Sequence, residues 1–173
     1  MSIDHRWARR LEAARGYLML EIPDRALAEL RGIGDAPDFR FEVQRLTGEA
    51  LRQKGAHEAA LAAFLRADAE QPDDLSVLMG MAWCFKRTDR LPQAIECMER
   101  AYRASPDEPI VLYNLACYHA LAGDKPQALS WLGRAIRMDR SLRKLIPEER
   151  DFDRLRHDPD FQFIVEAGKG NEE

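Results

Sequence analysis

Cysteine is scarce in this sequence, with only Cys84, Cys97 and Cys117 among 173 residues. An odd number of cysteines, at spacings that match no metal-binding motif, excludes a disulfide-stapled fold and a zinc finger. All three lie in stretches of helical pattern, where free cysteine is an ordinary small core residue. We therefore expect reduced thiols and, with them, a cytoplasmic protein.

The sequence also lacks an excess of positive charge and a long apolar run. Its 26 lysines and arginines are outnumbered by 30 aspartates and glutamates, which gives a formal net charge of -4. Such a protein has no overall positive field to attract a phosphate backbone. Nowhere do roughly 18 apolar residues stand together, and the N-terminal residues contain no signal-peptide core. We expect neither nucleic acid nor a membrane as partner.

Catalytic and cofactor-binding motifs are missing as well. His57-Glu58 begins like the zinc motif of metalloproteases, but Leu61 stands where the second histidine would be needed. The segment 32–34 has two glycines but lacks the third glycine and the preceding strand of a phosphate-binding loop. His119 has no acidic residue one turn away in sequence to orient it. The sequence therefore predicts no enzyme activity, no cofactor and no metal site.

What the sequence does contain is a pattern of small and bulky residues that recurs every 34 residues. Each period has an alanine, a bulky apolar residue four places later, and another small residue 12 places before the alanine. These columns are Ala26, Ala60, Ala94 and Ala128; Leu30, Phe64, Met98 and Leu132; and Ala14, Gly48, Ala82 and Ala116. Small residues let helices approach closely, so we expect antiparallel helix pairs that bury these columns.

The predicted connections repeat with the same period. Gly55 and Gly123 fall between the two helices of a pair, where a left-handed backbone conformation is cheapest for glycine, and Asp89 takes the equivalent place. Proline is tolerated in the first turn of a helix because its missing N–H has no partner there. Pro23, Pro92 and Pro126 are therefore expected to be early residues of second helices.

This pattern resembles the tetratricopeptide repeat, a helical hairpin of about 34 residues. The resemblance covers nearly the whole chain. It implies an all-α fold, a right-handed superhelix (α-solenoid) of about four hairpins with a C-terminal cap. We expect a single domain, residues 1–173. Its parts would be a divergent first repeat at 7–40, further repeats at 41–74, 75–108 and 109–142, and the cap at 143–168.

The expected cap has its own start signal. Asp158-Pro159 reads as a helix N-cap followed by the first helical residue. Phe152 and Phe161 are the bulky apolar residues that would cover the end of the last hairpin. The run from Asp151 to Val165 is similar to the tail that closes many bacterial tetratricopeptide arrays.

The resemblance implies a protein-interaction adaptor that binds a partner peptide or protein in the concave groove of the superhelix. On the first helix of each repeat, the residues of one side pack against neighbouring helices, and the residues of another side are expected to line that groove. Its candidate binding residues are Arg45, Arg52, Met79, Trp83, Lys86, Arg87, Tyr113, Asn114 and Cys117. With Arg15, Glu42 and Glu49 included, the groove carries a basic excess, which predicts an acidic partner segment with an apolar anchor. Trp83 either faces this groove or packs against a neighbouring helix.

Two further functions fit the same pattern. The apolar first helix of the fourth repeat could be buried in a homodimer, which would make the chain a self-associating scaffold. Small acidic secretion chaperones also have tetratricopeptide repeats. By contrast, the residues that hold a chaperone's C-terminal carboxylate in some members of the family are missing, because Glu49 and Gly80 occupy two of those positions. The pattern does not name the partner.

Overall fold

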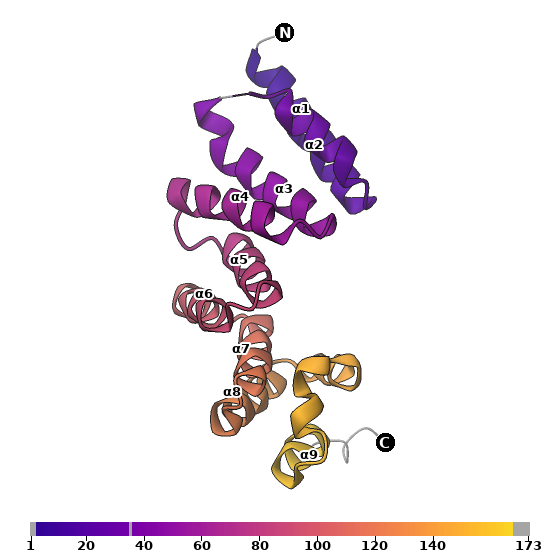
Figure 1. Cartoon of the computed structure of the whole chain (residues 1–173), viewed down its shortest axis with the longest axis vertical. Helices are drawn as coiled ribbons and strands as arrows, with labels where there is room; N and C mark the ends of the chain where they lie inside the picture. The colour runs from indigo at the N-terminus through magenta and orange to yellow at the C-terminus, as the bar shows by residue number, and fades with distance from the viewer. Residues whose placement is uncertain (1–2, 35, 168–173) are drawn as a thin grey trace. The chain divides into compact units, whose positions relative to one another are not determined.

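The computed structural model describes residues 3–34 and 36–167 of the chain, and these are helical without any strand. The elements, shown in Figure 1, are α1 (Ile3–Met19), α2 (Pro23–Arg31), η1 (Pro37–Phe39), α3 (Arg40–Gln53), α4 (His57–Glu70), α5 (Leu75–Arg87), α6 (Leu91–Ala104), α7 (Pro109–Leu121), α8 (Lys125–Met138), η2 (Arg140–Lys144), η3 (Ile146–Glu148), η4 (Arg150–Leu155) and α9 (Pro159–Glu166). The all-α class predicted from the sequence is confirmed.

Successive helices have the spacing that the sequence predicts. The second helices α4, α6 and α8 begin 34 residues apart. Pro23 is the first residue of α2, while Pro92 and Pro126 are the second residues of α6 and α8. The chain divides into two compact units, Met1–Cys97 and Met98–Glu173, with the boundary inside α6. The single domain and the four repeat boundaries expected from the sequence stay predictions.

Unit 1 (Met1–Cys97) has its core where the small-residue columns predict it. Ala14, Ala26 and Ala60 are 0% exposed. Phe64 of α4 lies between α3 and α5, because a Cβ atom added to Gly48 would come within 2.7 Å of its ring and one added to Gly80 within 2.5 Å. The two glycines therefore create the space that the aromatic ring fills, and the ring joins three helices.

The turns between paired helices share one backbone conformation. Gly55 and Gly123 have φ of 74° and 79°, and Asp89 has φ of 58°, so the predicted left-handed positions are confirmed. Glu21, at the same place in the first hairpin, has φ of 55°. The first hairpin, although divergent in sequence, therefore turns in the same way as the others.

Unit 2 (Met98–Glu173) is built on α7, which is buried on most of its surface by α8 and η4. Phe152 of η4 is fully buried, with its ring centroid 5.8 Å from that of Tyr113 and 5.4 Å from that of Phe161. Asp158 caps α9, accepting hydrogen bonds from the backbone N–H groups of Asp160 and Phe161. The segment after α8 thus covers α7 and α8 within the unit. Gly168, the last residue of the predicted cap, lies outside the described residues.

None of the described helices combines the length with the apolar character needed to cross a membrane.

Candidate protein-binding surfaces

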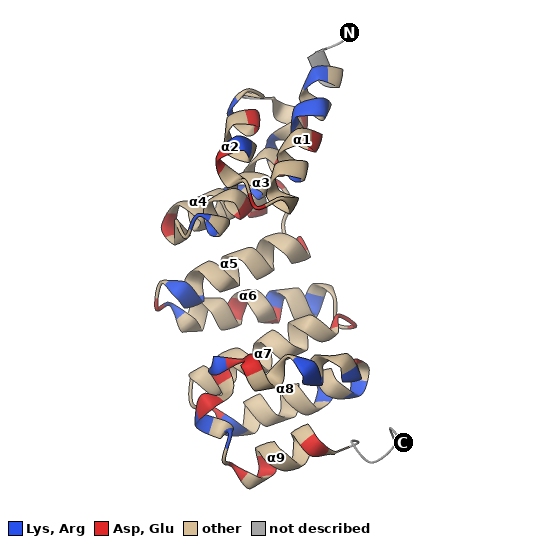
Figure 2. Ribbon diagram, turned by 90° about the vertical axis from the view of Figure 1, so that its right-hand side faces the viewer, with Lys and Arg blue, Asp and Glu red and all other residues tan. Residues whose placement is uncertain are grey.

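Six of the nine predicted binding residues lie in unit 1, on α3 and α5. Arg45 and Arg52 are two turns apart on α3 and point to the same side. On α5, Met79 and Trp83 are one turn apart, and Lys86 and Arg87 follow one turn later. We refer to these six residues as the α3–α5 face. Apart from its end at Lys86 and Arg87, α5 carries no charged residue (Figure 2).

Trp83 is held between charged neighbours rather than in the core. The guanidinium carbon of Arg52 lies 5.1 Å from the centroid of the indole, and that of Arg87 lies 5.6 Å from it. The ring of His57 approaches edge-on, with the two centroids 4.9 Å apart. Trp83 is half-buried and Arg87 is exposed. The indole is therefore fixed in place and still has part of its surface in contact with solvent.

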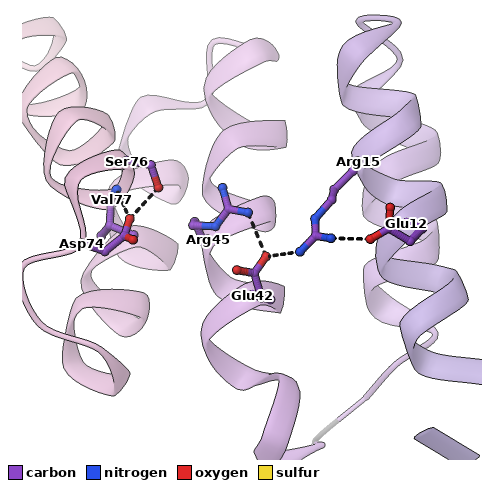
Figure 3. Close-up of polar contacts among 7 residues, drawn as sticks. All are labelled: Glu12, Arg15, Glu42, Arg45, Asp74, Ser76 and Val77. Atoms are coloured by element: carbon purple, nitrogen blue, oxygen red, sulfur yellow. Dashed lines mark hydrogen bonds and ion pairs between the residues drawn. The ribbon is translucent and has the colours of Figure 1, made fainter. Parts of the chain in front are cut away.

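The arginines of α3 are paired with acidic side chains. Glu42 accepts hydrogen bonds from Arg45 at 2.8 Å and from Arg15 of α1 at 2.9 Å, and Arg15 also pairs with Glu12 (Figure 3). Burial alone would raise the pKa of the Glu42 carboxyl, but the hydrogen bonds from Arg45 and Arg15 outweigh it and hold the pKa below its ordinary value. These contacts tie α1 to α3.

Arg52 is held in the same way. Its guanidinium donates to both carboxylate oxygens of Glu49, at 2.8 and 2.6 Å.

Because Glu12 also belongs to this set of contacts, the excess of basic over acidic residues is smaller than the sequence alone suggests. Five basic residues, with Arg15 counted, face three acidic ones, which leaves an excess of two. The set consists of Arg15, Arg45, Arg52, Lys86 and Arg87 against Glu12, Glu42 and Glu49.

The start of α5 fixes the direction of this face. Asp74 is the N-cap of the helix, and its Oδ1 accepts hydrogen bonds from the backbone N–H of Val77 at 3.0 Å and the hydroxyl of Ser76 at 2.6 Å (Figure 3). An aspartate at this position satisfies a backbone donor that has no partner within the helix. The helix therefore begins at a defined residue, and Trp83 follows two turns later.

Sequence reasoning missed two features of unit 1. One is His57, which in the sequence forms only an incomplete metal motif. Its ring contacts Trp83, and its buried Nδ1 has no hydrogen-bond partner in the part of the chain that the structure describes. The other is a cleft of about 650 Å³ that includes Leu11, Glu12 and Phe39 in its lining, from α1 and η1, beside Glu42 of α3. The repeat columns give no signal for this cleft, because η1 belongs to the divergent end of the first repeat.

The other three predicted residues lie on α7 in unit 2 and do not form an open surface. Tyr113 is 3% exposed and Cys117 is 2% exposed, while Asn114 is half-buried. Phe152 of η4 packs edge-on against Tyr113. This differs from the expectation that the apolar side of α7 is free to meet a partner or a second copy, because the chain's own C-terminal segment covers it.

Unit 2 has an aromatic cluster that the repeat pattern did not indicate. The rings of Tyr102 and Trp131 meet edge-on with centroids 5.0 Å apart. Arg134 lies over Trp131 at 4.4 Å and donates a hydrogen bond to the Tyr102 hydroxyl. All three are half-buried. A more general signal, aromatic residues and arginine one turn apart on a helix, could have drawn attention to Trp131 and Arg134.

The structure offers no support for a reactive thiol at Cys84. Cys84 is fully buried, and burial raises the pKa of its thiol to about 11. A thiol with so high a pKa is protonated at neutral pH, and the thiolate is the reactive form.

Comparisons with known proteins agree with this architecture. The family model of the tetratricopeptide repeat matches residues 11–74 and 81–142. The chain belongs to that family, whose members are protein-interaction scaffolds, and this is the class of protein that its hairpins define. No curated protein matches the chain by sequence.

Solved structures of MamA proteins have the same fold. MamA 41-end from Desulfovibrio magneticus RS-1 is 14% identical with a TM-score of 0.74, covering 99% of this chain and 100% of that one. A MamA AMB-1 structure is 18% identical with a TM-score of 0.71, covering 96% and 94%. A third MamA crystal structure is 17% identical with a TM-score of 0.72, covering 80% and 81%. At these identities the likeness concerns the fold.

Proposed function

We propose that this protein is a non-enzymatic adaptor whose α3–α5 face binds an acidic segment of a partner protein through an apolar anchor. The observation that carries the proposal is Trp83, half-exposed and held between Arg52 and Arg87. Tryptophan and arginine are the residue types that contribute most binding free energy at protein interfaces. Neighbours that fix the indole before binding lower the entropy that binding would cost.

The charges of the face favour an acidic partner. A carboxylate of the partner would meet Arg87 first, because this arginine is exposed and stacks on Trp83. Arg45 and Arg52 are already bonded to Glu42 and Glu49, so a partner carboxylate would compete with these glutamates. We therefore expect the charges to contribute to the rate and selectivity of association, and the indole to contribute most of the affinity.

The proposal is tested by replacing Trp83 with alanine. The partner is first captured from an extract of the source cell, and the purified pair is then titrated in a calorimeter. Trp83→Ala is expected to weaken binding roughly 30-fold or more, equivalent to about 2 kcal/mol. The free energy of unfolding should change by no more than about 1 kcal/mol, because the indole is half-exposed. Trp131→Ala is the matched control, since Trp131 lies on another surface.

Two results would reject this assignment. In one, Trp83→Ala unfolds the protein while the remaining folded molecules bind as before, which would make Trp83 a core residue. In the other, Trp131→Ala weakens binding and Trp83→Ala does not, which would move the binding surface to the aromatic cluster of unit 2. A cytoplasmic setting stays a prediction that rests on the three free cysteines.

A further inference from the structure

Three potential metal ligands meet inside unit 2. Cys117 of α7 lies beside Glu149 and Asp151, which flank the start of η4, and one ligand atom from each lies within 4.8 Å of the others. Cys117 is 2% exposed and Asp151 is 9% exposed, while Glu149 is half-buried. More than 30 residues separate the cysteine from the carboxylates. Because of that separation, no local motif in the sequence indicates a site here.

A buried phenol at the same place has no partner. The hydroxyl of Tyr113 is inaccessible to solvent and makes no hydrogen bond within the described residues. Tyr113 lies one turn before Cys117 on the same side of α7, and its phenol is close enough to Cys117, Glu149 and Asp151 to interact electrostatically with all three. A buried hydroxyl is unfavourable without a hydrogen bond, so a polar ligand beside Tyr113 would stabilise it.

Arg156 is a cation near the cluster, and its guanidinium has other acceptors. Its Nε donates to Asp153 at 2.8 Å, and its other nitrogens donate to the backbone carbonyls of Glu149 and Ile146. One carboxylate oxygen of Glu149 accepts the backbone N–H of Asp151 at 3.1 Å, which leaves the other oxygen for coordination. Buried carboxylates are tolerated when they are paired or coordinate a metal.

We propose that Cys117 Sγ and one carboxylate oxygen each of Glu149 and Asp151 bind a zinc ion, with a zinc-bound water hydrogen-bonded to the Tyr113 hydroxyl. A thiolate combined with carboxylates suits zinc rather than magnesium or calcium. In a tetrahedral zinc site the ligand atoms lie about 3.5 Å from one another. The distances between the three ligand atoms, which are up to 4.8 Å here, would therefore have to shorten by about 1 Å when zinc binds. The ion would fasten η4 to α7. This proposal is independent of the α3–α5 face.

Zinc binding can be measured on the full-length protein. The metal-free protein is titrated with zinc chloride in a calorimeter, and the stoichiometry is checked by native mass spectrometry. One zinc ion per chain is expected, with a rise in the thermal midpoint that magnesium chloride does not produce. Glu149→Gln should lower the affinity at least about tenfold, because even indirect partners of a metal contribute that much. Its side chain is half-buried, so this variant tests the site even if Cys117→Ser fails to fold.

Cobalt identifies the ligand. Cobalt(II) in the site should give a thiolate-to-metal charge-transfer band in the near ultraviolet. The band should disappear in Cys117→Ser and persist in Cys97→Ala, which serves as the matched control. The proposal is overturned if folded wild-type protein binds no stoichiometric zinc. It is equally overturned if Glu149→Gln retains full affinity, or if the cobalt band survives in folded Cys117→Ser. In those cases protonation of the acidic groups, and not a metal ion, stabilises the buried cluster.

Discussion

At the level of single residues, the repeat columns predict burial well. Phe64, Met98 and Leu132, from the bulky column, are at most 2% exposed. The columns succeed because close helix packing depends on side-chain size at fixed spacing, which is visible in sequence. The neighbours of Trp83 were not predictable in this way. They depend on the rotamers of Arg52 and Arg87, which are flexible side chains and follow no column.

The packing around Phe64 gives a first prediction. A glycine inside a helix is normally unfavourable, but Gly48→Ala should destabilise the protein by about 1–3 kcal/mol, because the new Cβ would meet the Phe64 ring at 2.7 Å. Gly16→Ala is the control. It lies in α1 with nothing within 4 Å and should stabilise by about 0.5–1 kcal/mol. Urea denaturation measures both, and equal effects would mean that Phe64 yields easily.

The first turn gives a second prediction. Glu21 has φ of 55°, a conformation that strains any residue with a Cβ by about 1–2 kcal/mol. Glycine removes this strain but loses more backbone entropy on folding. Glu21→Gly should therefore stabilise the protein by up to about 1 kcal/mol. Gly55→Ala, at the equivalent turn with φ of 74°, should destabilise. Thermal unfolding measures both variants. A lower midpoint for Glu21→Gly would show that contacts of its side chain outweigh the strain.

At the level of helices, pairing in the hairpins was predictable, and the charge contacts between them were not. The order and starts of the helices follow from prolines, small residues and turns that recur at one spacing. The contact of Arg15 in α1 with Glu42 in α3 depends on how the first two hairpins pack. The divergent first repeat does not keep the columns that would have set this packing.

The Glu42 contacts predict a dependence of stability on pH. The folded pKa of Glu42 lies below its ordinary value near 4.5, because hydrogen bonds from Arg45 and Arg15 outweigh its burial. Its contribution to stability is therefore fully present above the unfolded pKa and is lost as pH falls through the folded pKa. Glu42→Gln should destabilise the protein at pH 7, and the difference from wild type should shrink at about pH 3.

Urea denaturation at the two pH values measures that difference. Glu70→Gln is the control, since Glu70 is exposed on α4 and should have a small effect at both. A gap between Glu42→Gln and wild type that stays constant with pH would show that the carboxylate charge does not contribute.

At the level of the whole molecule, the single domain predicted from the sequence stays a prediction, and the structure describes two compact units that divide inside α6. The structure of the C-terminal segment could not be predicted in full from the sequence. Asp158 signalled the start of α9, but η2, η3 and η4 are short 3₁₀ turns that have no helical period to read. Without them the apolar side of α7 looked open, although Phe152 covers Tyr113.

Removal of that segment should be damaging. A chain that ends at Leu142 would expose the side of α7 that contains Tyr113, so it should aggregate or unfold at lower temperature. Within the intact chain, Phe152→Ala should cost about 3–5 kcal/mol, because the ring is fully buried. Phe163→Ala should change little, since Phe163 is 75% exposed. Size-exclusion chromatography and denaturation measure these effects. A monomeric truncated protein with an unchanged thermal midpoint would show that the segment is dispensable.

The position of Trp83 also has an optical consequence. The chain has three tryptophans, and among the described residues Trp83 is the one with two guanidinium groups over its ring. If Trp7 and Trp131 are replaced by phenylalanine, the remaining tryptophan fluorescence comes from the α3–α5 face alone. An acidic segment that covers the indole would shift its emission and shield it from a soluble quencher. The protein would then report, without any attached dye, each time that this face becomes occupied.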